Sequence, residues 1–403
     1  MSSTPRSPTP EVHSGSSPSA AGARKQAEPP PAGSIGAWLR QEAQIPVVWL
    51  TAAAFLLFGK GWLAQAQSST ALTLILFGVL FVAIMWGAFG VVRHAEHLAE
   101  KLGEPYGTLI LTLSVTIIEV AFIVTAVITT QDAQTPVVRD AVFAVVMIMI
   151  NAVIGLCLLV GGLRHHEQEF NLPGARAFLS VAIPLAAITL VLPNFTVFAH
   201  GPTLSPPQAV ILAALILFLY GVFLTMQTMR YRAFFSDPHG GAEDMIGDHH
   251  HSPRSVGYHA AALLATLIPA VYLTEELGLI VQRAVAAMNA PVALVGVIVA
   301  ILVLAPEAMG AVQAARRDQL QRSVNIALGS VLATIGLTMP AVLMIGLAMD
   351  KTIVLGVDPE GMVLLGITFL VSVLTFGGER TNMLQGAVHL VMFLVFLTLI
   401  FHP

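Results

Sequence analysis

After about residue 45, the chain is a series of long apolar runs separated by short polar breaks. Each run is about 20 residues or longer, which is enough for an α-helix to cross roughly 30 Å of hydrocarbon. None shows the alternation of apolar and polar positions over about ten residues that marks a membrane β-strand. The pattern therefore predicts about eleven transmembrane helices, over residues 46–66, 70–92, 107–130, 138–162, 175–198, 208–229, 258–280, 291–315, 323–349, 353–375 and 381–401.

Composition supports a polytopic membrane protein of the all-α class. Hydrophobic residues make up 56% and charged residues 10% of the chain, against about 25% charged residues in soluble domains. The lipid bilayer is the expected partner, and we expect neither a nucleic-acid partner nor a bound cofactor. The single cysteine, Cys157, lies in an apolar run and gives no basis for a disulfide framework.

Positive charge predicts the orientation of the chain in the membrane. Lys and Arg concentrate in the loops on one side of the predicted membrane, and cytoplasmic loops carry such an excess as a rule. We therefore predict a cytoplasmic N-terminus, an external C-terminus and a multi-pass location in the inner (plasma) membrane. The exceptions on the opposite side are Lys60, Arg139, Arg283 and Lys351.

The predicted helices form two groups of five after an extra first helix. Residues 1–44 are a Pro- and Ser-rich stretch that predicts a disordered cytoplasmic tail, and the extra helix lies in 45–69. Residues 70–230 and 258–403 are the two predicted repeats, joined by a cytoplasmic linker, 231–257, rich in His and acidic residues. Because five is odd, the second group enters from the opposite face, which predicts an inverted repeat of the kind found in secondary transporters.

Glu119 and Glu307 are the candidate cation- and proton-binding residues. Each is the only ionisable side chain in about twenty residues, and they differ by 188 positions, the offset that also relates 70–92 to 258–280. A charge at the bilayer centre costs about 2.5–3.5 kcal/mol even on the lenient insertion scale, so such residues usually handle ions or protons. The competing interpretation is a carboxyl kept neutral by an interhelical hydrogen bond.

Oxygen-bearing side chains recur in the same predicted helices and in the helices that follow them. A hard cation such as Ca²⁺ takes six to eight oxygen ligands, so the two glutamates are the predicted metal ligands and these residues their support. A hydroxyl in a transmembrane helix also often bonds to its own backbone, and that alternative stays open. The predicted supporting ligands are Ser114, Thr116, Asn151, Ser330 and Thr334.

Three further residues are candidates for a proton path. Glu275 and Glu276 lie near the predicted outer end of the seventh helix, and His389 lies inside the eleventh. The alternatives are solvated interface carboxylates and a packing histidine. The linker run Asp248–His251 is a candidate metal or pH sensor, although short charged linkers are usually only solvated.

Four segments bear a resemblance to a known family: Gly107–Glu119 (GTLILTLSVTIIE), Ala305–Glu307 (APE), Ala327–Ser330 (ALGS) and Arg380–His389 (RTNMLQGAVH). Over nearly all of residues 46–401, the chain is similar to bacterial calcium/proton antiporters of the calcium:cation antiporter superfamily. This resemblance implies that Glu119 and Glu307 are the transport glutamates of the two repeats. It also matches Gly329-Ser330 to the Gly-Ser of the family's second repeat.

The chain departs from the family pattern just before both glutamates. Proton exchangers of eukaryotic type place Gly-Asn four and three residues before each glutamate. This chain has Val115-Thr116 and Val303-Leu304 there. Thr116 retains an oxygen, whereas Leu304 offers none through its side chain.

These observations predict secondary antiport of Ca²⁺, with Na⁺ and K⁺ as further candidate cargoes, for H⁺ by alternating access at the two glutamates. An intramembrane metalloenzyme is the first alternative, but the chain has no His-Glu-x-x-His sequence. A passive cation channel is the second alternative, disfavoured because isolated carboxylates on small-residue helices suit an occluded site. We expect no enzymatic activity, and the sequence leaves a homo-oligomer open.

Overall fold

The computed structural model describes residues 41–66, 68–102, 106–129, 134–197, 201–238, 254–291 and 293–401. The chain divides into two compact units, Met1–Ala43 and Gln44–Pro403, and the second unit contains the fold discussed below. Nearly all of the predicted tail, 1–44, and the middle of the predicted linker, 231–257, with Asp248–His251, lie outside the described residues.

Eleven consecutive helices make up the described part of the second unit, which confirms the predicted all-α membrane fold. Their bounds are α2 (Gln44–Ala66), α3 (Thr70–Leu102), α4 (Tyr106–Thr129), α5 (Val137–Val146) continued by η1 (Met147–Val153) and α6 (Ile154–His165), α7 (Leu172–Ala186) continued by η2 (Ala187–Val191) and η3 (Leu192–Phe195), α8 (Pro206–Thr225) continued by η4 (Met226–Arg230), α9 (Val256–Ala287), α10 (Ala293–Arg316), α11 (Leu320–Ala333) continued by η6 (Thr334–Thr338) and α12 (Met339–Ala348), α13 (Pro359–Thr375) and α14 (Met383–Phe401). A short 3₁₀ turn, η5 (Arg232–Phe235), follows α8.

Among the described residues, nine of these helices are long and apolar enough to cross a membrane. The other two contain shorter apolar segments, Leu113–Thr125 in α4 and Pro359–Thr375, which is α13. α4 is 24 residues long over its full bounds, and α13, with 17 residues, reaches the lower end of the spanning range. Both lie between longer helices in chain order, so the eleven-helix arrangement stands.

Three predicted boundaries were wrong. The second predicted helix, 70–92, continues to Leu102, because the charged segment after Val92 is rich in Ala, Glu and Leu, which favour helix. The seventh, 258–280, continues to Ala287, because residues 281–287 are rich in Ala, with Gln and Arg, and these residues favour helix. The tenth begins at Pro359 rather than at 353, since Thr352–Ile353 form a strand and Pro at the first helical position starts the helix.

Short strands tie the two halves together at each end of the helices. β1 (Gln134–Thr135), in the α4–α5 loop, pairs in parallel with β3 (Thr352–Ile353), in the α12–α13 loop. At the other end, β2 (Glu167–Glu169), between α6 and α7, pairs antiparallel with β4 (Arg380–Asn382), between α13 and α14.

Backbone and side-chain contacts complete a symmetric pattern. Near β3, the amides of Leu355 and Gly356 donate to Pro202 O in the α7–α8 loop. Near β2, Gln168 Nε2 donates to Ala315 O and Asp318 Oδ1 at the α10–α11 turn. Exchanging the first and second halves maps one end onto the other, which is the pattern expected of an inverted repeat.

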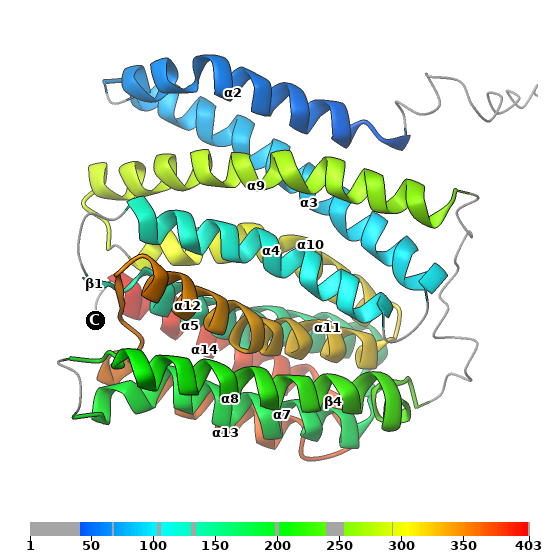
Figure 1. Cartoon of the computed structure of the whole chain (residues 1–403). Coiled ribbons are helices and arrows are strands. Elements are labelled where there is room, and N and C mark those ends of the chain that lie inside the picture. Colours follow the sequence, from blue (N-terminus) through cyan, green and yellow to red (C-terminus); the bar gives the residue numbers. More distant parts are fainter. Residues whose placement is uncertain are drawn as a thin grey trace, which may run out of the picture. The chain divides into compact units, whose positions relative to one another are not determined.

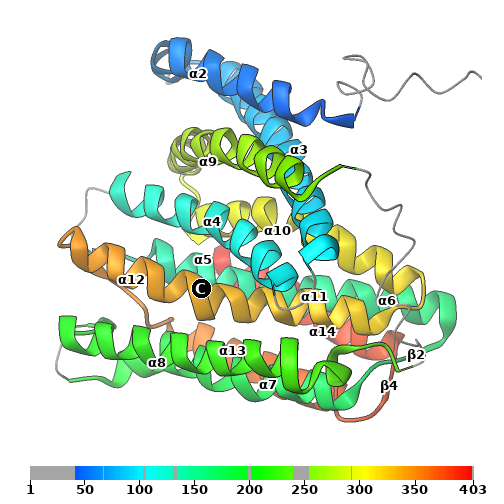
Figure 2. The same ribbon diagram turned by 45° about the vertical axis from the view of Figure 1, so that its right-hand side comes forward.

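The helices run side by side in layers (Figure 1). The first helices of the two halves, α3 and α9, pack against each other beneath α2, and α4 and α10 follow on their other side. α7, α8 and α13 lie at the opposite edge from α2, as the turned view also shows (Figure 2). The central helices α4 and α10, which carry the two candidate glutamates, are therefore enclosed on both sides.

Glycines bring the third helix of each half close to the fifth helix of the other. A Cβ on Gly162 would lie 2.5 Å from Met383 N in α14, and one on Gly336 would lie 2.5 Å from Tyr220 Cδ2 in α8. Both positions therefore need glycine for the observed helix approach, as small residues generally allow in membranes.

Candidate cation-binding site

Glu119 lies near the middle of α4 and points at the third helix of the second half. Its Oε2 accepts hydrogen bonds from Thr334 Oγ1 at 3.1 Å and Thr338 Oγ1 at 2.9 Å, both in η6. Its Oε1 is buried and has no hydrogen-bond partner among the described residues. One oxygen of this carboxyl is therefore satisfied by hydroxyls, and the other faces the protein interior with no donor.

Glu307 lies near the middle of α10 and contacts the same helix one turn earlier. Its Oε2 accepts a hydrogen bond from Ser330 Oγ at 3.2 Å. Ser330 and Thr334 are four residues apart, and residues at that spacing are neighbours on a helix face, with Cβ atoms about 5–6 Å apart. The two carboxyls therefore lie side by side along a single row of hydroxyls, and neither forms an ion pair within the described part of the chain.

The row of hydroxyls lies where the helix changes its winding. η6 is a π-helical segment that covers Thr334–Thr338. Single π turns within α-helices are rare and are frequent at functional sites, because the wider turn alters the direction of side chains and backbone groups. Here the segment turns both threonines toward Glu119.

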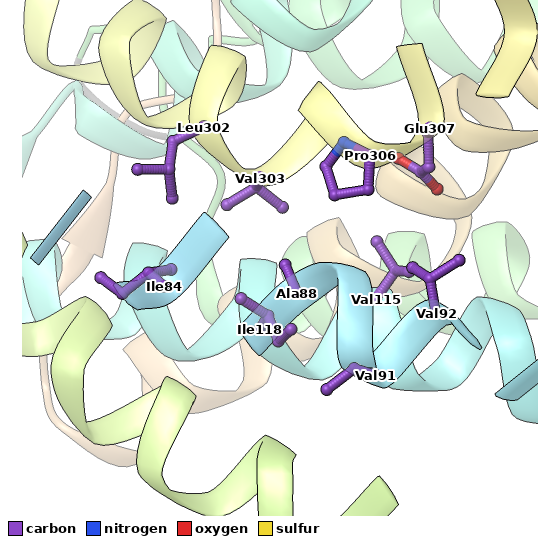
Figure 3. A pocket seen from close by; sticks show the side chains of 10 residues that line it. All are labelled: Ile84, Ala88, Val91, Val92, Val115, Ile118, Leu302, Val303, Pro306 and Glu307. Atoms are coloured by element: carbon purple, nitrogen blue, oxygen red, sulfur yellow. The ribbon is translucent and has the colours of Figure 1, made fainter. Parts of the chain in front are cut away.

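A narrow cavity lies beside Glu307, between α3, α4 and α10 (Figure 3). Its free volume of about 10 Å³ is near the minimum that one water molecule needs. Apart from the Glu307 carboxyl, its walls are apolar, so a hydrated cation does not fit in this conformation. The lining residues are Ile84, Ala88, Val91, Val92, Val115, Ile118, Leu302, Val303, Pro306 and Glu307.

Pro306 alters the backbone next to Glu307. Proline has no amide hydrogen, so the carbonyl of Leu302, four residues earlier in α10, has no helical donor at that position. Both residues line the cavity. The backbone therefore contributes an oxygen without its usual helix bond near the two carboxyls.

The structure brings only some of the predicted supporting ligands to the glutamates. Ser330 and Thr334 contact them directly. Ser114 instead donates to Ile110 O of its own helix at 2.6 Å, which is the alternative considered for membrane hydroxyls. Thr116 is buried one turn before Glu119.

Asn151 and His389 belong to a separate polar cluster. Asn151 lies in η1; its Nδ2 donates to Thr368 Oγ1 at 2.9 Å, and its Oδ1 lies 3.1 Å from His389 Nδ1. His389 Nε2 lies 3.0 Å from Thr375 Oγ1. These hydrogen bonds join η1, α13 and α14, and neither residue bonds to Glu119 or Glu307 among the described contacts.

Glu275 and Glu276 lie on α9, away from the row of hydroxyls. Glu275 is exposed. Glu276 Oε1 accepts a hydrogen bond from Tyr272 at 2.9 Å, while its Oε2 is buried without a described partner. The pair therefore combines one solvated carboxyl with one that is partly enclosed.

Thr338 is the site residue that sequence reasoning missed. It is fully buried and makes the shorter of the two hydrogen bonds to Glu119. Its spacing of four from Thr334, which is itself four from Ser330, was a usable signal, because such spacing places hydroxyls on one helix face.

Two related bundles of five helices, with one buried carboxyl from each half near the middle of its helix, are typical of secondary transporters of the inverted-repeat class. Residues 72–229 and 258–402 match the family described as sodium/calcium exchanger protein, and the chain belongs to this family.

Two bacterial transporters resemble the chain over most of its length. It is 42% identical over 333 residues to the putative ionic transporter y4hA of Sinorhizobium fredii, covering 83% of this chain and 89% of the relative. It is 38% identical over 322 residues to the sodium-potassium/proton antiporter ChaA of Escherichia coli, covering 79% and 87%. The chain is therefore a cation antiporter, and the enzyme alternative has no support among these relatives.

A solved structure shares the fold. The Ca²⁺/H⁺ antiporter protein YfkE superposes with a TM-score of 0.67 at 20% identity, covering 90% of this chain and 99% of that chain. At this identity, the likeness concerns the arrangement of the helices.

Proposed function

We propose that this protein exports Ca²⁺ in exchange for H⁺ by alternating access at a site formed by Glu119 and Glu307. The observation that supports this most is the buried Oε1 of Glu119, which has no hydrogen-bond donor within the described residues. A carboxyl oxygen in that position is completed by a metal cation or by a proton, and the two exclude each other. Coupling follows from this exclusion.

Charge balance favours a divalent cargo. Two ionised carboxyls in a low-dielectric interior are very costly without a counter-charge. One Ca²⁺ or two protons neutralise the pair, whereas one Na⁺ or K⁺ leaves a net negative charge. The hydroxyls of Ser330, Thr334 and Thr338, with the Leu302 carbonyl, supply further hard oxygen ligands.

Alkali cations are a second candidate cargo, on one specific observation. Leu304 is buried beside the site and provides no side-chain oxygen, so Ca²⁺ has fewer ligands than the six to eight that it prefers. The Escherichia coli relative, at 38% identity, is named a sodium-potassium/proton antiporter. We therefore expect Na⁺ and K⁺ to be exchanged more weakly.

The conformation fits an occluded or nearly occluded state. Access to Glu307 passes through a cavity that holds about one water molecule, so exchange requires α3, α4 or α10 to move. We place the β2–β4 end at the cytoplasm and the β1–β3 end outside, following the positive-inside rule, in the inner membrane.

A cation panel in sealed vesicles tests the proposal. Purified protein is reconstituted with a pH-sensitive dye inside, and Ca²⁺, Mg²⁺, Na⁺ or K⁺ is added outside. We expect proton movement with Ca²⁺ at the lowest concentration and with Na⁺ and K⁺ only at higher ones. Proton movement with Na⁺ and K⁺ alone would show that the Ca²⁺ assignment is wrong while leaving antiport intact.

The same vesicles separate antiport from a channel. An antiporter moves a cation only when a proton or another cation moves in return, so a membrane potential alone drives no net flux. Cation flux that follows an imposed potential, without any proton movement, would contradict the proposed mechanism.

A further inference from the structure

A groove lies between α7 and α8, at the edge of the molecule opposite α2 (Figure 1, Figure 2). Its volume is about 310 Å³, which is within the range of pockets that hold small molecules, and it is open rather than enclosed. Most of its wall is apolar, with Val181, Leu219 and Val222 among the lining side chains. An open apolar groove on the outside of a membrane helix bundle lies against lipid acyl chains.

The groove is about as deep as the hydrocarbon layer of one leaflet. Along α7 it runs from Pro173, in the first turn, to Val181. At a rise of 1.5 Å per residue, the interval 173–181 spans about 12 Å. Half of a hydrocarbon core of roughly 30 Å is about 15 Å. One acyl chain lying along the two helices therefore fits the length of the groove.

Aromatic packing and a fixed chain segment hold the groove in shape. Phe223, which lines the groove, packs against Phe178 at 5.1 Å and against Phe235 at 5.8 Å between ring centroids. The segment η5, which contains Phe235, is tied to the start of α7 because Asn171 Nδ2 donates to Ala233 O at 2.9 Å. The groove is therefore formed before any ligand enters it.

Arg176 supplies a positive charge at the wall of the groove. It is exposed, and its Nη2 donates to Gly377 O at 3.2 Å. Gly377 lies two residues after Thr375, the last residue of α13, so the guanidinium lies at the level where the helices end. Its other N–H groups have no acceptor, and it forms no ion pair, within the described ranges. Such a guanidinium can bind a phosphate through two parallel hydrogen bonds.

The charges around the groove favour an anion. Arg230 and Arg232, both exposed, lie at the end of α8 and the start of η5. The carboxyls nearest in the chain are those of Asp237, after η5, and Glu379, between α13 and β4. Neither forms an ion pair with Arg176. Three guanidiniums against two carboxyls leave a net positive charge at this end of the groove.

We propose that this groove is a binding site for an anionic phospholipid, with one acyl chain along α7 and α8 and the phosphate on Arg176. Basic pockets between transmembrane helices on the cytoplasmic side commonly bind anionic lipid head groups, and α7 begins beside β2, at the end that we place at the cytoplasm. The site is separate from Glu119 and Glu307, neither of which lines the groove, so this inference goes beyond the proposed antiport and does not depend on it.

Native mass spectrometry of the full-length protein, delipidated in detergent, tests the site with two lipids that share the same acyl chains, phosphatidylglycerol and phosphatidylcholine. We expect phosphatidylglycerol to bind at least about tenfold more tightly, because only this lipid brings a net negative charge to the three guanidiniums. Arg176→Gln should lose most of that preference. Arg322→Gln, at an exposed position of α11 outside the groove, is the matched control and should keep it.

Ser180→Phe separates the groove from the charge. Ser180 is exposed and lines the groove, and its hydroxyl bonds to Ala177 O of its own helix, so the larger side chain fills space without breaking a contact between helices. We expect it to weaken the binding of both lipids by a similar factor.

Two results would overturn the proposal: equal affinities of the wild type for the two lipids, or a preference for phosphatidylglycerol that Arg176→Gln leaves intact. A dimer mass with no bound lipid would also overturn it, because the groove would then be an interface between two copies of the chain.

Photocrosslinking of the wild type gives a second test that needs no variant. The probe is phosphatidylglycerol with a diazirine in one acyl chain. We expect adducts on peptides that contain 173–181 and 219–226, and competition by unlabelled phosphatidylglycerol but not by the same amount of phosphatidylcholine. Adducts spread evenly over other helices, such as α2 and α14, would contradict a specific site and leave only the general lipid layer around the protein.

Discussion

The molecule has two buried polar clusters, and they differ in whether their hydrogen bonds are complete. Around Asn151, the amide, the His389 ring and the hydroxyls of Thr368 and Thr375 can all be paired. Around Glu119, one carboxyl oxygen takes two hydroxyl donors while the other has none in the described part of the chain.

This difference separates a structural network from a candidate binding site. A fully paired buried network stabilises one arrangement and has no free ligand to offer. A buried carboxyl oxygen without a donor is costly unless something else binds it. The presence of a polar side chain in a membrane helix is thus a poor guide to function. What matters is whether its hydrogen-bonding groups are already paired within the protein.

The largest expected effect is on Glu119→Gln and Glu307→Gln. Glutamine keeps the volume and the hydroxyl contacts but cannot alternate between ionised and protonated forms. We expect each variant to remain monodisperse in detergent and to lose cation-driven proton flux by at least about a hundredfold, because a site of this kind works by charge. Cation-driven proton flux in sealed vesicles measures this loss.

Normal flux in either variant would refute the two-carboxyl mechanism. Loss of flux bears on charge only if the variant remains monodisperse. Glu360→Gln, which makes the same chemical change at an exposed position, serves as the control. Glu360 is an exposed glutamate in the first turn of α13, and its replacement should leave flux unchanged.

A smaller effect is expected for Thr334→Val/Thr338→Val. Valine retains the shape of threonine while removing both donors to Glu119 Oε2. A hydrogen bond to a charged group contributes about 1.5–3 kcal/mol, so the KM for the cation should change by at least about tenfold while the protein folds.

The matched control is Thr189→Val in η2. Thr189 is fully buried but bonds only to the backbone of its own helix, at Leu185 O and Ala186 O. Its replacement should leave the KM within about twofold. Equal changes in both variants would mean that the hydroxyls of η6 are not part of the site.

The sequence was sufficient to predict the helices and to single out two buried carboxyls as candidates, because both depend on local pattern. An apolar run of spanning length, and a lone charge within it, can each be recognised without knowing any neighbour. The partners of the charge were less accessible. Ser114 and Thr334 look alike in sequence, yet one bonds to its own helix and the other to Glu119, since helix rotation and packing decide the outcome.

Asn151 illustrates the same limit from the other side. It was expected near the glutamates because an amide suits a hard cation, but η1 turns it toward Thr368 and His389. The sequence pattern within one helix does not show which of several neighbouring helices the Asn151 side chain will face. The short strands β1 to β4 were likewise missed, since two or three residues give no periodicity.

Asn151→Leu should therefore affect stability more than transport. The change removes the Asn151 partner of His389 Nδ1 and the Asn151 donor to Thr368 Oγ1, at a cost of about 1–3 kcal/mol, and the melting temperature in detergent should fall. The KM for the cation should stay within about twofold of wild type. An unchanged melting temperature with a strongly raised KM would move Asn151 from the structural cluster to the site.

The smallest effect is expected from removing residues 1–34. Their composition, rich in Pro, Ser and Gly, predicts neither a core nor an anchor. Vesicle flux of the truncated protein should equal that of the full chain. A truncated protein that inserts and remains monodisperse but transports nothing would reveal a role for the tail.

The hydroxyl partners of Glu119 have a consequence for how the protein is made. Thr334 and Thr338 follow Glu119 by 215 and 219 residues. At about 5–20 residues per second, a ribosome needs roughly 10–40 s to cover that interval. During this time α4 is in or near the bilayer, and the residues that donate to its carboxyl have not yet been synthesised. The membrane quality-control machinery can therefore detect an unpaired polar group while only the first half of the chain has been made.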